Sequence, residues 1–237
     1  LDMAMVEQGL AESPQKAQAL IMAGRVRIGD QPAHTAGQRV LTEATIKVEP
    51  GLDYVGRGGI KLAHALDHFQ LNVSGVTALD VGASTGGFTH CLLLRGARRV
   101  HALDVGYGQL DYRLRQDPRV TVMERTNARH PFHLDEVVDL ATVDVSFISL
   151  TKVLPSVASH LKEGGHIVAL VKPQFEAKRR EVGRRGVIQD PRVHARVLGR
   201  TITWLVNSGF RLKDLVPSPI TGDEGNREFF VLISLSG

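Results

Sequence analysis

The stretch that decides the fold is Leu79-Asp80-Val81-Gly82-Ala83-Ser84-Thr85-Gly86-Gly87-Phe88-Thr89. A short apolar run, typical of a buried strand, leads into a glycine-rich turn, and a helix pattern starts at Gly87. Gly82 permits a sharp turn, and Gly86 and Gly87 let backbone amides approach a ligand without an intervening Cβ. Doubly wound α/β folds bind ligands at such a turn, so we expect this fold with a ligand at this loop.

Strand and helix patterns alternate on both sides of this stretch. We predict strands at residues 78–81, 100–105, 120–123, 138–143 and 166–171, and helices at 60–69, 87–95, 109–116, 150–161 and 194–208. The continuous Val, Leu and Ile runs are typical of a parallel sheet that is buried on both faces. Residues 210–216 and 229–235 have no room between them for a crossover helix, so we expect them to pair antiparallel at the sheet edge. The sequence thus predicts a seven-stranded, mostly parallel sheet with an antiparallel last strand.

The first fifty residues have a different pattern. Apolar spacings of three and four predict helices at 3–9 and 13–23, and strands are predicted at 25–28 and 40–48 around the turn Gly29-Asp30-Gln31-Pro32. Residues 51–59 are glycine-rich and lack apolar periodicity. We therefore expect a small α+β domain at 1–50, a linker at 51–59 and the α/β domain at 60–237.

Composition limits the class of protein. The chain has 237 residues, of which 43% are hydrophobic, and no run approaches the roughly 18 apolar residues of a membrane span. Cys91 is the only cysteine, which excludes an internal disulfide and a Cys-based zinc site, and we expect no metal. The start, Leu1-Asp2-Met3, carries no signal-peptide pattern and no initiator Met, so we expect a trimmed start and a cytoplasmic protein.

Positive charge is concentrated in one segment. The net charge is +4, which favours a polyanionic partner. Residues 1–56 hold five Lys or Arg against seven Asp or Glu, whereas residues 177–200 hold eight against two. Either phosphate contact or a solvated loop explains such a run.

Two carboxylates bear on the choice of cofactor. Asp80 lies two residues before the first glycine of the loop, and Asp104 ends the second strand, where it can accept both hydroxyls of a ribose. A carboxylate at the loop would repel a pyrophosphate and attract an ammonium group, which favours S-adenosylmethionine over NAD. Asn127, after the third strand, is placed to meet an adenine, although Asn is also common in turns. The expected cofactor residues are Asp80, Gly82, Ala83, Ser84, Thr85, Gly86, Gly87, Phe88, Asp104 and Asn127.

Four further motifs follow in order. They are Arg57-Gly58-Gly59-Ile60-Lys61-Leu62, Asp144-Val145-Ser146-Phe147-Ile148-Ser149-Leu150, Val171-Lys172-Pro173-Gln174-Phe175-Glu176 and Asn226-Arg227-Glu228-Phe229. With the glycine loop, this set closely resembles the TlyA family of hemolysin-named ribosomal RNA methyltransferases, whose catalytic domain is FtsJ-like. The resemblance covers nearly the whole chain. It implies a Rossmann-like class I methyltransferase domain, cytidine 2'-O-methylation of ribosomal RNA, and a catalytic tetrad of Lys61, Asp144, Lys172 and Glu228.

The chemistry of these four residue types agrees with that implication. A ribose hydroxyl is a poor nucleophile, so methyl transfer to it needs a nearby base and an aligned geometry. Lys172 is the candidate base; a lysine is ordinarily protonated at neutral pH, and a second cation at Lys61, together with the sulfonium, would favour the neutral amine. Asp144 and Glu228 are expected to orient the lysines and the ribose. Ordinary ion pairs explain any one of these residues better than they explain all four.

The N-terminal module resembles the S4-like RNA-binding domain that a small-subunit ribosomal protein shares with RNA-modifying enzymes. Leu1-Asp2, Gly9-Leu10-Ala11, Ser13, Lys16-Ala17, Ile21 and Gly24-Arg25-Val26 carry the likeness. Family members commonly have Arg after the serine, where this chain has Pro14. The expected RNA contacts are Lys16, Arg25, Arg27, Arg57, Lys178, Arg179, Arg180, Arg184 and Arg185.

These observations favour an S-adenosylmethionine-dependent RNA 2'-O-methyltransferase whose partner is ribosomal RNA or ribosomal subunits, with no DNA and no membrane expected. Two alternatives stay open. A non-catalytic RNA-binding or ribosome-assembly factor would bind RNA and transfer no methyl. A membrane-lytic hemolysin would need an amphipathic or spanning segment, which the sequence does not display.

Overall fold

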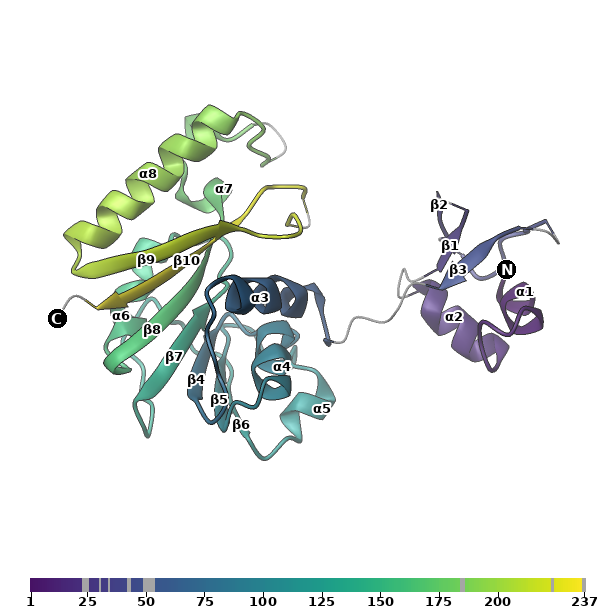
Figure 1. Ribbon diagram of the computed structural model, residues 1–237, viewed down its shortest axis with the longest axis horizontal. Coiled ribbons are helices and arrows are strands. Elements are labelled where there is room, and N and C mark those ends of the chain that lie inside the picture. Colours follow the sequence, from purple (N-terminus) through teal and green to yellow (C-terminus); the bar gives the residue numbers. More distant parts are fainter. Residues whose placement is uncertain are drawn as a thin grey trace. The chain divides into compact units, whose positions relative to one another are not determined.

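The computed structural model describes residues 1–22, 26–29, 31–33, 35–41, 44–48, 54–183, 186–222 and 224–235. The chain forms two compact units, Leu1–Asp53 and Tyr54–Gly237 (Figure 1). Three of the expected RNA contacts, Arg25, Arg184 and Arg185, lie outside the described residues, as does part of the expected linker.

The N-terminal unit is a small α+β domain. It consists of α1 (Asp2–Glu7), α2 (Pro14–Met22), β1 (Val26–Ile28), β2 (Gln31–Pro32) and β3 (Ile46–Val48), with the antiparallel sheet order β2-β1-β3. Met5, Ala17, Ile21 and Val26 are buried in its core. Pro14 begins α2, where the missing N–H would have no intrahelical partner.

Two sequence predictions for this unit were wrong. Gln31 and Pro32 were expected in a turn, but they pair with Ile28 and Arg27 as an edge strand. An edge strand tolerates proline because one side of it needs no ladder donor. The strand expected from residue 40 begins only at Ile46, and Leu41 is exposed, so it has no buried face to hold it in the sheet.

The second unit has one seven-stranded sheet in the order β6-β5-β4-β7-β8-β10-β9. Its strands are β4 (Thr77–Val81), β5 (Arg99–Leu103), β6 (Val120–Met123), β7 (Val138–Val143), β8 (Leu161–Val171), β9 (Phe210–Pro217) and β10 (Phe229–Leu235). The first five strands of that order are parallel, and β10 runs antiparallel to both β8 and β9. The predicted mostly parallel sheet with an antiparallel last strand is confirmed.

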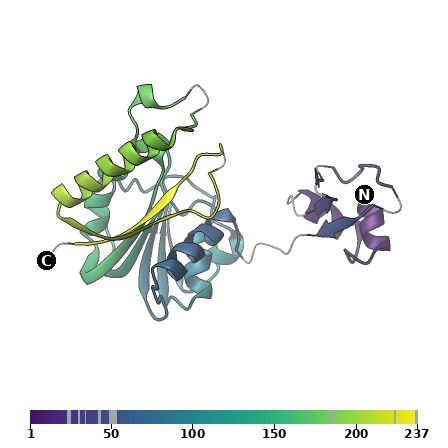
Figure 2. The same cartoon turned by 45° about the horizontal axis from the view of Figure 1, so that its top comes forward.

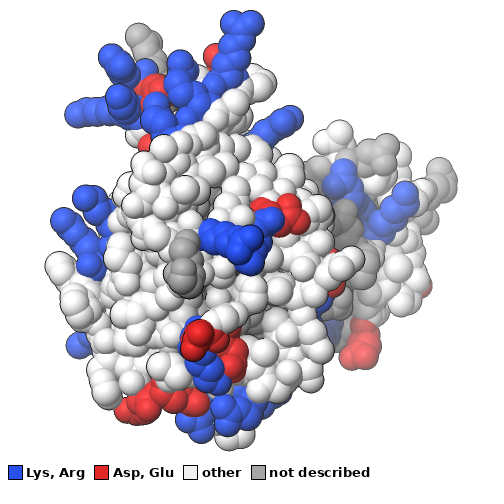
Figure 3. Space-filling view, turned by 60° about the vertical axis from the view of Figure 1, so that its left-hand side comes forward, with Lys and Arg blue, Asp and Glu red and all other residues white. Residues whose placement is uncertain are grey.

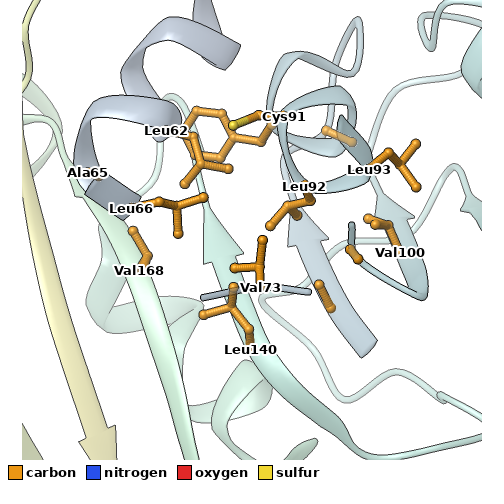
Figure 4. Packing of buried hydrophobic residues seen from close by; sticks show 14 of the residues in the cluster. Leu62, Ala65, Leu66, Val73, Cys91, Leu92, Leu93, Val100, Leu140 and Val168 are labelled. Atoms are coloured by element: carbon orange, nitrogen blue, oxygen red, sulfur yellow. The ribbon is translucent and has the colours of Figure 1, made fainter. Parts of the chain in front are cut away.

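Helices cover both faces of this sheet (Figures 1 and 2). They are α3 (Arg57–His68), α4 (Gly87–Leu94) and α5 (Tyr112–Arg115) on one face, and α6 (Leu154–Ala158) and α8 (Pro191–Asn207) on the other, with the short α7 (Pro173–Glu176), η1 (Leu150–Lys152) and η2 (Arg179–Glu181) in loops. Because successive side chains of a strand point to opposite faces, Leu140 and Val168 pack under α3 and α4 (Figure 4), while Ala141 and Ile167 pack in the other core. Both faces are therefore buried, which explains the continuous apolar runs.

The helix expected at 150–161 is broken. η1 ends at Lys152, and α6 spans only Leu154–Ala158 with Pro155 in its first turn. A proline fits the first turn of a helix and not its interior, so the chain restarts a helix there. β8 then begins at Leu161, ahead of the predicted residue 166, and α3 begins at Arg57, ahead of the predicted residue 60.

Six chain segments meet at the edge of the sheet that the carboxyl ends of its parallel strands form. They are the loops after β4, β5, β7 and β8, the chain before β10 and the start of α3. The parallel strands β4, β5, β7 and β8 end at this edge, and β10 starts there because Phe229 pairs with Val171. The glycine loop, residues 144–150, residues 172–176 and the chain before Phe229 are thus neighbours, and the start of α3 packs on the glycine loop, as the closeness of Gly58 to Gly87 shows.

Candidate active site

Two adjoining cavities lie at this edge of the sheet. The larger, about 510 Å³ and here called the lysine cavity, is lined by Lys61, Asp144, Lys172 and Glu228. The smaller, about 370 Å³ and here called the Asp104 cavity, is lined by Asp104 and Asn127 among others. Both cavities have Gly82, Ser84, Asp144, Ser146 and Phe147 in their walls. The four residues expected to act in catalysis therefore share one cavity, which adjoins the expected cofactor loop.

Lys61 and Glu228 form a buried ion pair. Lys61 Nζ donates to Glu228 Oε2 over 2.6 Å, and the side chains are only 11% and 3% exposed. Lys61 projects from α3, whereas Glu228 immediately precedes β10, so the pair joins the two ends of the unit. A buried charge of this kind requires its partner, because removing one group leaves the other uncompensated.

Lys172 and Asp144 form a second ion pair. Lys172 Nζ lies 2.6 Å from Asp144 Oδ1 and donates to Ser146 Oγ over 2.9 Å. Lys172 follows β8 and Asp144 follows β7, which are adjacent parallel strands. The Asp144 carboxylate and the Ser146 hydroxyl thus hold the Lys172 side chain in place. Lys61, which is expected to act as a second cation near Lys172, contacts Glu228 in the structure.

The glycine loop approaches Asp144 closely. Gly82 has a φ of 84°, and a Cβ there would overlap the carbonyl oxygen of Asp144. Gly86 has a φ of 98°, and a Cβ there would overlap the side chain of Leu114. Both positions thus require glycine. Gly82, Ser84, Thr85, Gly87 and Phe88 line the lysine cavity, whereas Ala83 is buried in the core under α4.

Asp104 is held by the backbone around it. Its Oδ2 accepts the N–H of Ser84 over 2.8 Å, and its Oδ1 accepts the N–H of Gly106 over 2.7 Å. Each carboxylate oxygen can accept a further hydrogen bond from a ligand. Asn127 lines the same cavity, and its Oδ1 accepts the N–H of Arg129 over 3.0 Å, so it also stabilises a turn.

Asp80 does not reach either cavity, which corrects its expected contact with the cofactor. It is fully buried, and its oxygens accept hydroxyl hydrogen bonds from Thr89 over 2.7 Å and from Thr142 over 3.0 Å. Burial raises the pKa of Asp80 to about 6, against the lowering effect of the two threonines. Asp80 can influence a bound cation only through its electric field and through the loop that it supports.

Three cavity residues received no role in the sequence analysis. Phe147 has a φ of 63° and is 91% exposed, and its ring centroid lies 5.1 Å from that of Phe175. Gln174 lies in the wall of the lysine cavity beside them. All three stood in the quoted motifs, but nothing in a sequence shows that an aromatic ring is left in solvent. A bulky residue with a positive φ is uncommon, and Phe147 adopts it in the wall of the lysine cavity.

The half-buried Glu176 and the buried Asn226 hold the loops of the site together. Glu176 accepts the Ser149 hydroxyl over 2.6 Å and the N–H of Leu150 over 2.7 Å, and burial raises its pKa. Asn226, only 1% exposed, accepts the N–H of Ile188 and donates to the carbonyl of Gly186, both over 3.0 Å. The loops after β7 and β8 are thus tied together, and residues 186–188 are tied to the start of β10.

The expected RNA contacts lie at several places. Lys178, Arg179 and Arg180 are exposed at η2, where Lys and Arg side chains gather at the top of Figure 3. Glu181 within this group accepts from Arg200 over 2.7 Å and 3.0 Å, which holds the pKa of Glu181 at about 2. Arg57 lines the lysine cavity and donates to the carbonyl of Thr221 over 2.8 Å. In the N-terminal unit, Lys16 is exposed and Arg27 is half-buried.

Comparisons with known proteins cover the same two units. The model of the FtsJ-like methyltransferase family matches residues 54–235, and that of the S4 domain matches residues 1–46. The 16S/23S rRNA (cytidine-2'-O)-methyltransferase TlyA of Mycobacterium tuberculosis is 45% identical over 235 residues, which are 98% of this chain and 88% of the relative. Hemolysin A of Brachyspira hyodysenteriae is 39% identical over 232 residues, which are 97% of both chains. The solved structure of a hemolysin-named protein from Streptococcus thermophilus has a TM-score of 0.79 and 40% identity, and covers 99% of this chain and 87% of that one.

Proposed function

Because the chain belongs to the FtsJ-like methyltransferase family and carries an S4 domain, we propose that it methylates a ribose 2'-hydroxyl of ribosomal RNA. The relative from Mycobacterium tuberculosis is named for cytidine, and we propose the same target nucleoside here. The observation that carries the proposal is the meeting of Lys61, Asp144, Lys172 and Glu228, from four separate motifs, in the wall of one cavity beside the glycine loop.

The smaller cavity is the proposed site for the nucleoside part of S-adenosylmethionine. Asp104 offers acceptors for ribose hydroxyls, and Asn127 and the backbone of residues 82–88 complete the proposed cofactor site. When bound, this cofactor supplies a methyl group on a positively charged sulfur. Because a Cβ at position 82 would overlap Asp144, the loop and the catalytic pair can adjoin only with glycine there.

Lys172 is the proposed proton acceptor for the ribose hydroxyl. Lys172 would act in this step as the neutral amine, and Asp144 Oδ1, 2.6 Å from Lys172 Nζ, offers a direct acceptor for the proton that an ammonium carries. The neutral amine would then accept the proton of the 2'-hydroxyl, which makes this oxygen the better nucleophile toward the methyl group that the cofactor would supply. The proton would leave Asp144 through the exposed part of this side chain, which is 20% exposed overall although Oδ1 itself is buried.

The Lys61–Glu228 pair is proposed to position the ribose. It offers a hydrogen-bond donor and an acceptor side by side in the wall of the cavity. Holding the hydroxyl in line with the methyl group removes much of the entropic barrier to the reaction. The exposed ring of Phe147, in the same wall, is proposed to stack on the target base, as single-stranded RNA bases commonly do on aromatic side chains.

Phosphate contacts are proposed for Lys178, Arg179 and Arg180 beside the site and for Lys16 and Arg27 in the N-terminal unit, together with Arg57 at the cavity. The same role is proposed for Arg25, Arg184 and Arg185 on the basis of sequence alone. Such contacts position an RNA and carry little sequence information.

The proposal is tested by incubating the protein with tritiated S-adenosylmethionine and ribosomal subunits, then digesting the RNA to nucleosides. We expect label in 2'-O-methylcytidine and none in base-methylated nucleosides. RNA binding without transfer would support the non-catalytic alternative, against which the presence of all four catalytic residue types argues. Label on a base would show that the acceptor is wrong.

A further inference from the structure

We propose that Gln174 reads the base of the target nucleotide through its side-chain amide and thereby selects cytidine over uridine. This inference rests on the proposed function, because it concerns the nucleotide whose ribose lies at Lys172.

Gln174 is in the wall of the cavity in which the base must lie. It occupies the first turn of α7, between Lys172 and Phe175 in sequence, and lines the lysine cavity together with both of them. A base is bonded to the ribose carbon next to the one that bears the 2'-hydroxyl. A nucleotide whose 2'-oxygen meets Lys172 therefore places its base in the same cavity, where the rings of Phe147 and Phe175 offer apolar faces.

The amide of Gln174 is not used by the fold. Its Oε1 is buried and has no hydrogen-bond partner in the described part of the chain. The other polar groups of the same loop have partners, since Lys172 contacts Asp144 and Ser146, and Glu176 accepts from Ser149 and Leu150. Buried polar atoms nearly always have partners, so an unused amide in a substrate cavity indicates a contact that forms with the ligand.

The chemistry of an amide matches cytosine. The Watson–Crick edge of cytosine offers the N3 acceptor beside the N4 amino donor, and a glutamine offers one donor and one acceptor in the complementary order. In the structure Oε1 is the buried atom of a side chain that is itself partly exposed and lines the cavity, and the proposal places the N–H2 donor, the other end of the amide, toward N3 of the base. Uracil carries N3–H, a donor, where cytosine carries an acceptor, and it would be matched only after the amide had turned round.

The experiment compares two substrates. The target cytidine is located from the mark that the wild-type protein makes, and ribosomal subunits are then prepared with uridine at that position. We expect wild type to prefer the cytidine subunits in kcat/KM by about ten-fold or more, which corresponds to about 1.4 kcal/mol. Gln174→Ala should reduce the preference to about three-fold or less, mainly through a slower reaction at cytidine.

A second variant reports on the direction of the hydrogen bonds. Gln174→Glu replaces the donor by an oxygen, which repels N3 of cytosine and accepts N3–H of uracil, so its cytidine preference should be lower than that of Gln174→Ala. The matched control is Gln116→Ala, at an exposed position that lines neither cavity. Affinity for S-adenosylmethionine and the thermal unfolding temperature are measured for every variant, and if Gln174→Ala does not fold, Gln174→Glu alone decides.

Each outcome has one meaning. An unchanged cytidine preference in Gln174→Ala or in Gln174→Glu would overturn the inference, and so would a wild-type protein that accepts both subunits equally. A wild-type protein that methylates neither substrate would instead overturn the proposed function, together with the inference that rests on it.

Discussion

Two ion pairs of the same length, Lys61–Glu228 and Lys172–Asp144, form the residue-scale arrangement on which the proposed chemistry depends. Their surroundings differ, because Glu228 is 3% exposed whereas Asp144 is 20% exposed. The pair with access to solvent can exchange a proton, and the enclosed pair can hold a fixed geometry. This difference supports the division of roles between a proton acceptor and a positioning pair.

Replacing Lys172 tests the first role. Lys172→Ala should lower the rate of methyl transfer by about 10²- to 10⁴-fold, the usual contribution of a general base, while affinity for S-adenosylmethionine changes only a few-fold. Single-turnover rates and titration calorimetry measure the two quantities. Lys162→Ala is the matched control, because Lys162 Nζ lies 2.6 Å from Asp139 Oδ1 at the other end of the sheet. Full turnover by Lys172→Ala would remove the proposed base.

Asp80 gives a prediction about stability and pH. Its pKa in the folded protein is about 6, against 3.8 for an ordinary aspartate, and the main cause is burial. Because the folded pKa is the higher one, the stabilising effect of the bound proton is complete below pH 3.8 and is lost as the pH rises through about 6. The shift corresponds to about 3 kcal/mol at pH 8.

We therefore expect Asp80→Asn to raise the thermal unfolding temperature relative to wild type at pH 8, and to raise it less or not at all at pH 4. The hydroxyls of Thr89 and Thr142 can rotate to accept from the new amide, so the hydrogen bonds need not be lost. Differential scanning calorimetry at the two pH values measures the effect. An equal difference at both pH values would show that the charge of Asp80 is not the cause.

Sequence reasoning grouped Lys61, Asp144, Lys172 and Glu228 because the resemblance to the TlyA family implies them as a tetrad, and in the structure all four line one cavity. It misjudged Asp80, although the residue type and spacing were read correctly. Alternation along β4 puts Asp80 on the same face as Ala78, and α4 covers that face with Thr89 above the carboxylate. Whether a polar side chain at a strand end faces a cavity or lies under a helix depends on tertiary packing, which a local pattern does not contain.

At the scale of elements, the basic segment at η2 (Lys178, Arg179 and Arg180) and the carboxylate of Glu228, proposed to position the ribose, are linked through the chain between them. Asn226 joins residues 186–188 to the start of β10, two residues from Glu228, through hydrogen bonds to Ile188 and Gly186. A Cβ at Gly222 would lie 2.6 Å from Glu228 Oε1, so the chain before β10 also closes over that carboxylate. A displacement of the basic segment should therefore also displace the Glu228 side chain.

Removing the two hydrogen bonds of Asn226 should both loosen the basic segment and slow the reaction. Asn226→Ala loses two hydrogen bonds, one of them to the buried N–H of Ile188, whose loss costs about 1–3 kcal/mol if that group stays unpaired. We expect kcat/KM on ribosomal subunits to fall by about ten-fold or more and trypsin to cleave faster after Arg179 and Arg180, while affinity for S-adenosylmethionine is retained. Asn207→Ala, at the exposed end of α8, is the control. Cleavage at the wild-type rate would show that Asn226 does not hold the segment.

The lengths of the elements were harder to predict than their order. The Gly164-Gly165 pair reads as a turn, yet β8 passes through it and starts at Leu161. The apolar spacing of residues 150–161 favoured one helix, but Pro155 and the early start of β8 divide it. The start of β8 depends on its pairing with β7, in which Leu161 lies opposite Val138, and such pairing involves residues that are far apart in the chain.

At the scale of the whole molecule, the proposed chemistry and much of the proposed recognition belong to different units. Both cavities and both ion pairs lie within Tyr54–Gly237. A pocket that holds one nucleotide has little surface with which to choose one site in a large RNA, so selection needs shape and phosphate contacts elsewhere. The N-terminal unit has the S4 domain match but few basic residues, and the η2 segment has many.

Deleting residues 1–50 should therefore leave affinity for S-adenosylmethionine unchanged and abolish or strongly weaken methylation of structured RNA. Charge reversal at Lys178, Arg179 and Arg180 should instead weaken RNA binding for all sequences and reduce its dependence on salt. RNA affinity at several salt concentrations and the position of the methyl mark are compared among the three proteins. A truncated protein that marks the same nucleotide at the normal rate would contradict this division.

The place of β10 has a consequence for the order in which the protein matures. It is the last strand along the chain, yet it lies between β8 and β9, and in the described sheet β9 is attached only through it. While a ribosome is still synthesising β10, strands β4 to β8 can already pair. At that stage β9 has no partner strand in the sheet. Lys61 also lacks its partner Glu228, which lies 167 residues further along the chain. Contacts of such long range form late in folding. A nascent chain can thus hold the cofactor loop before it holds a complete active site, so the ability to modify RNA is acquired only when synthesis of this unit is nearly finished.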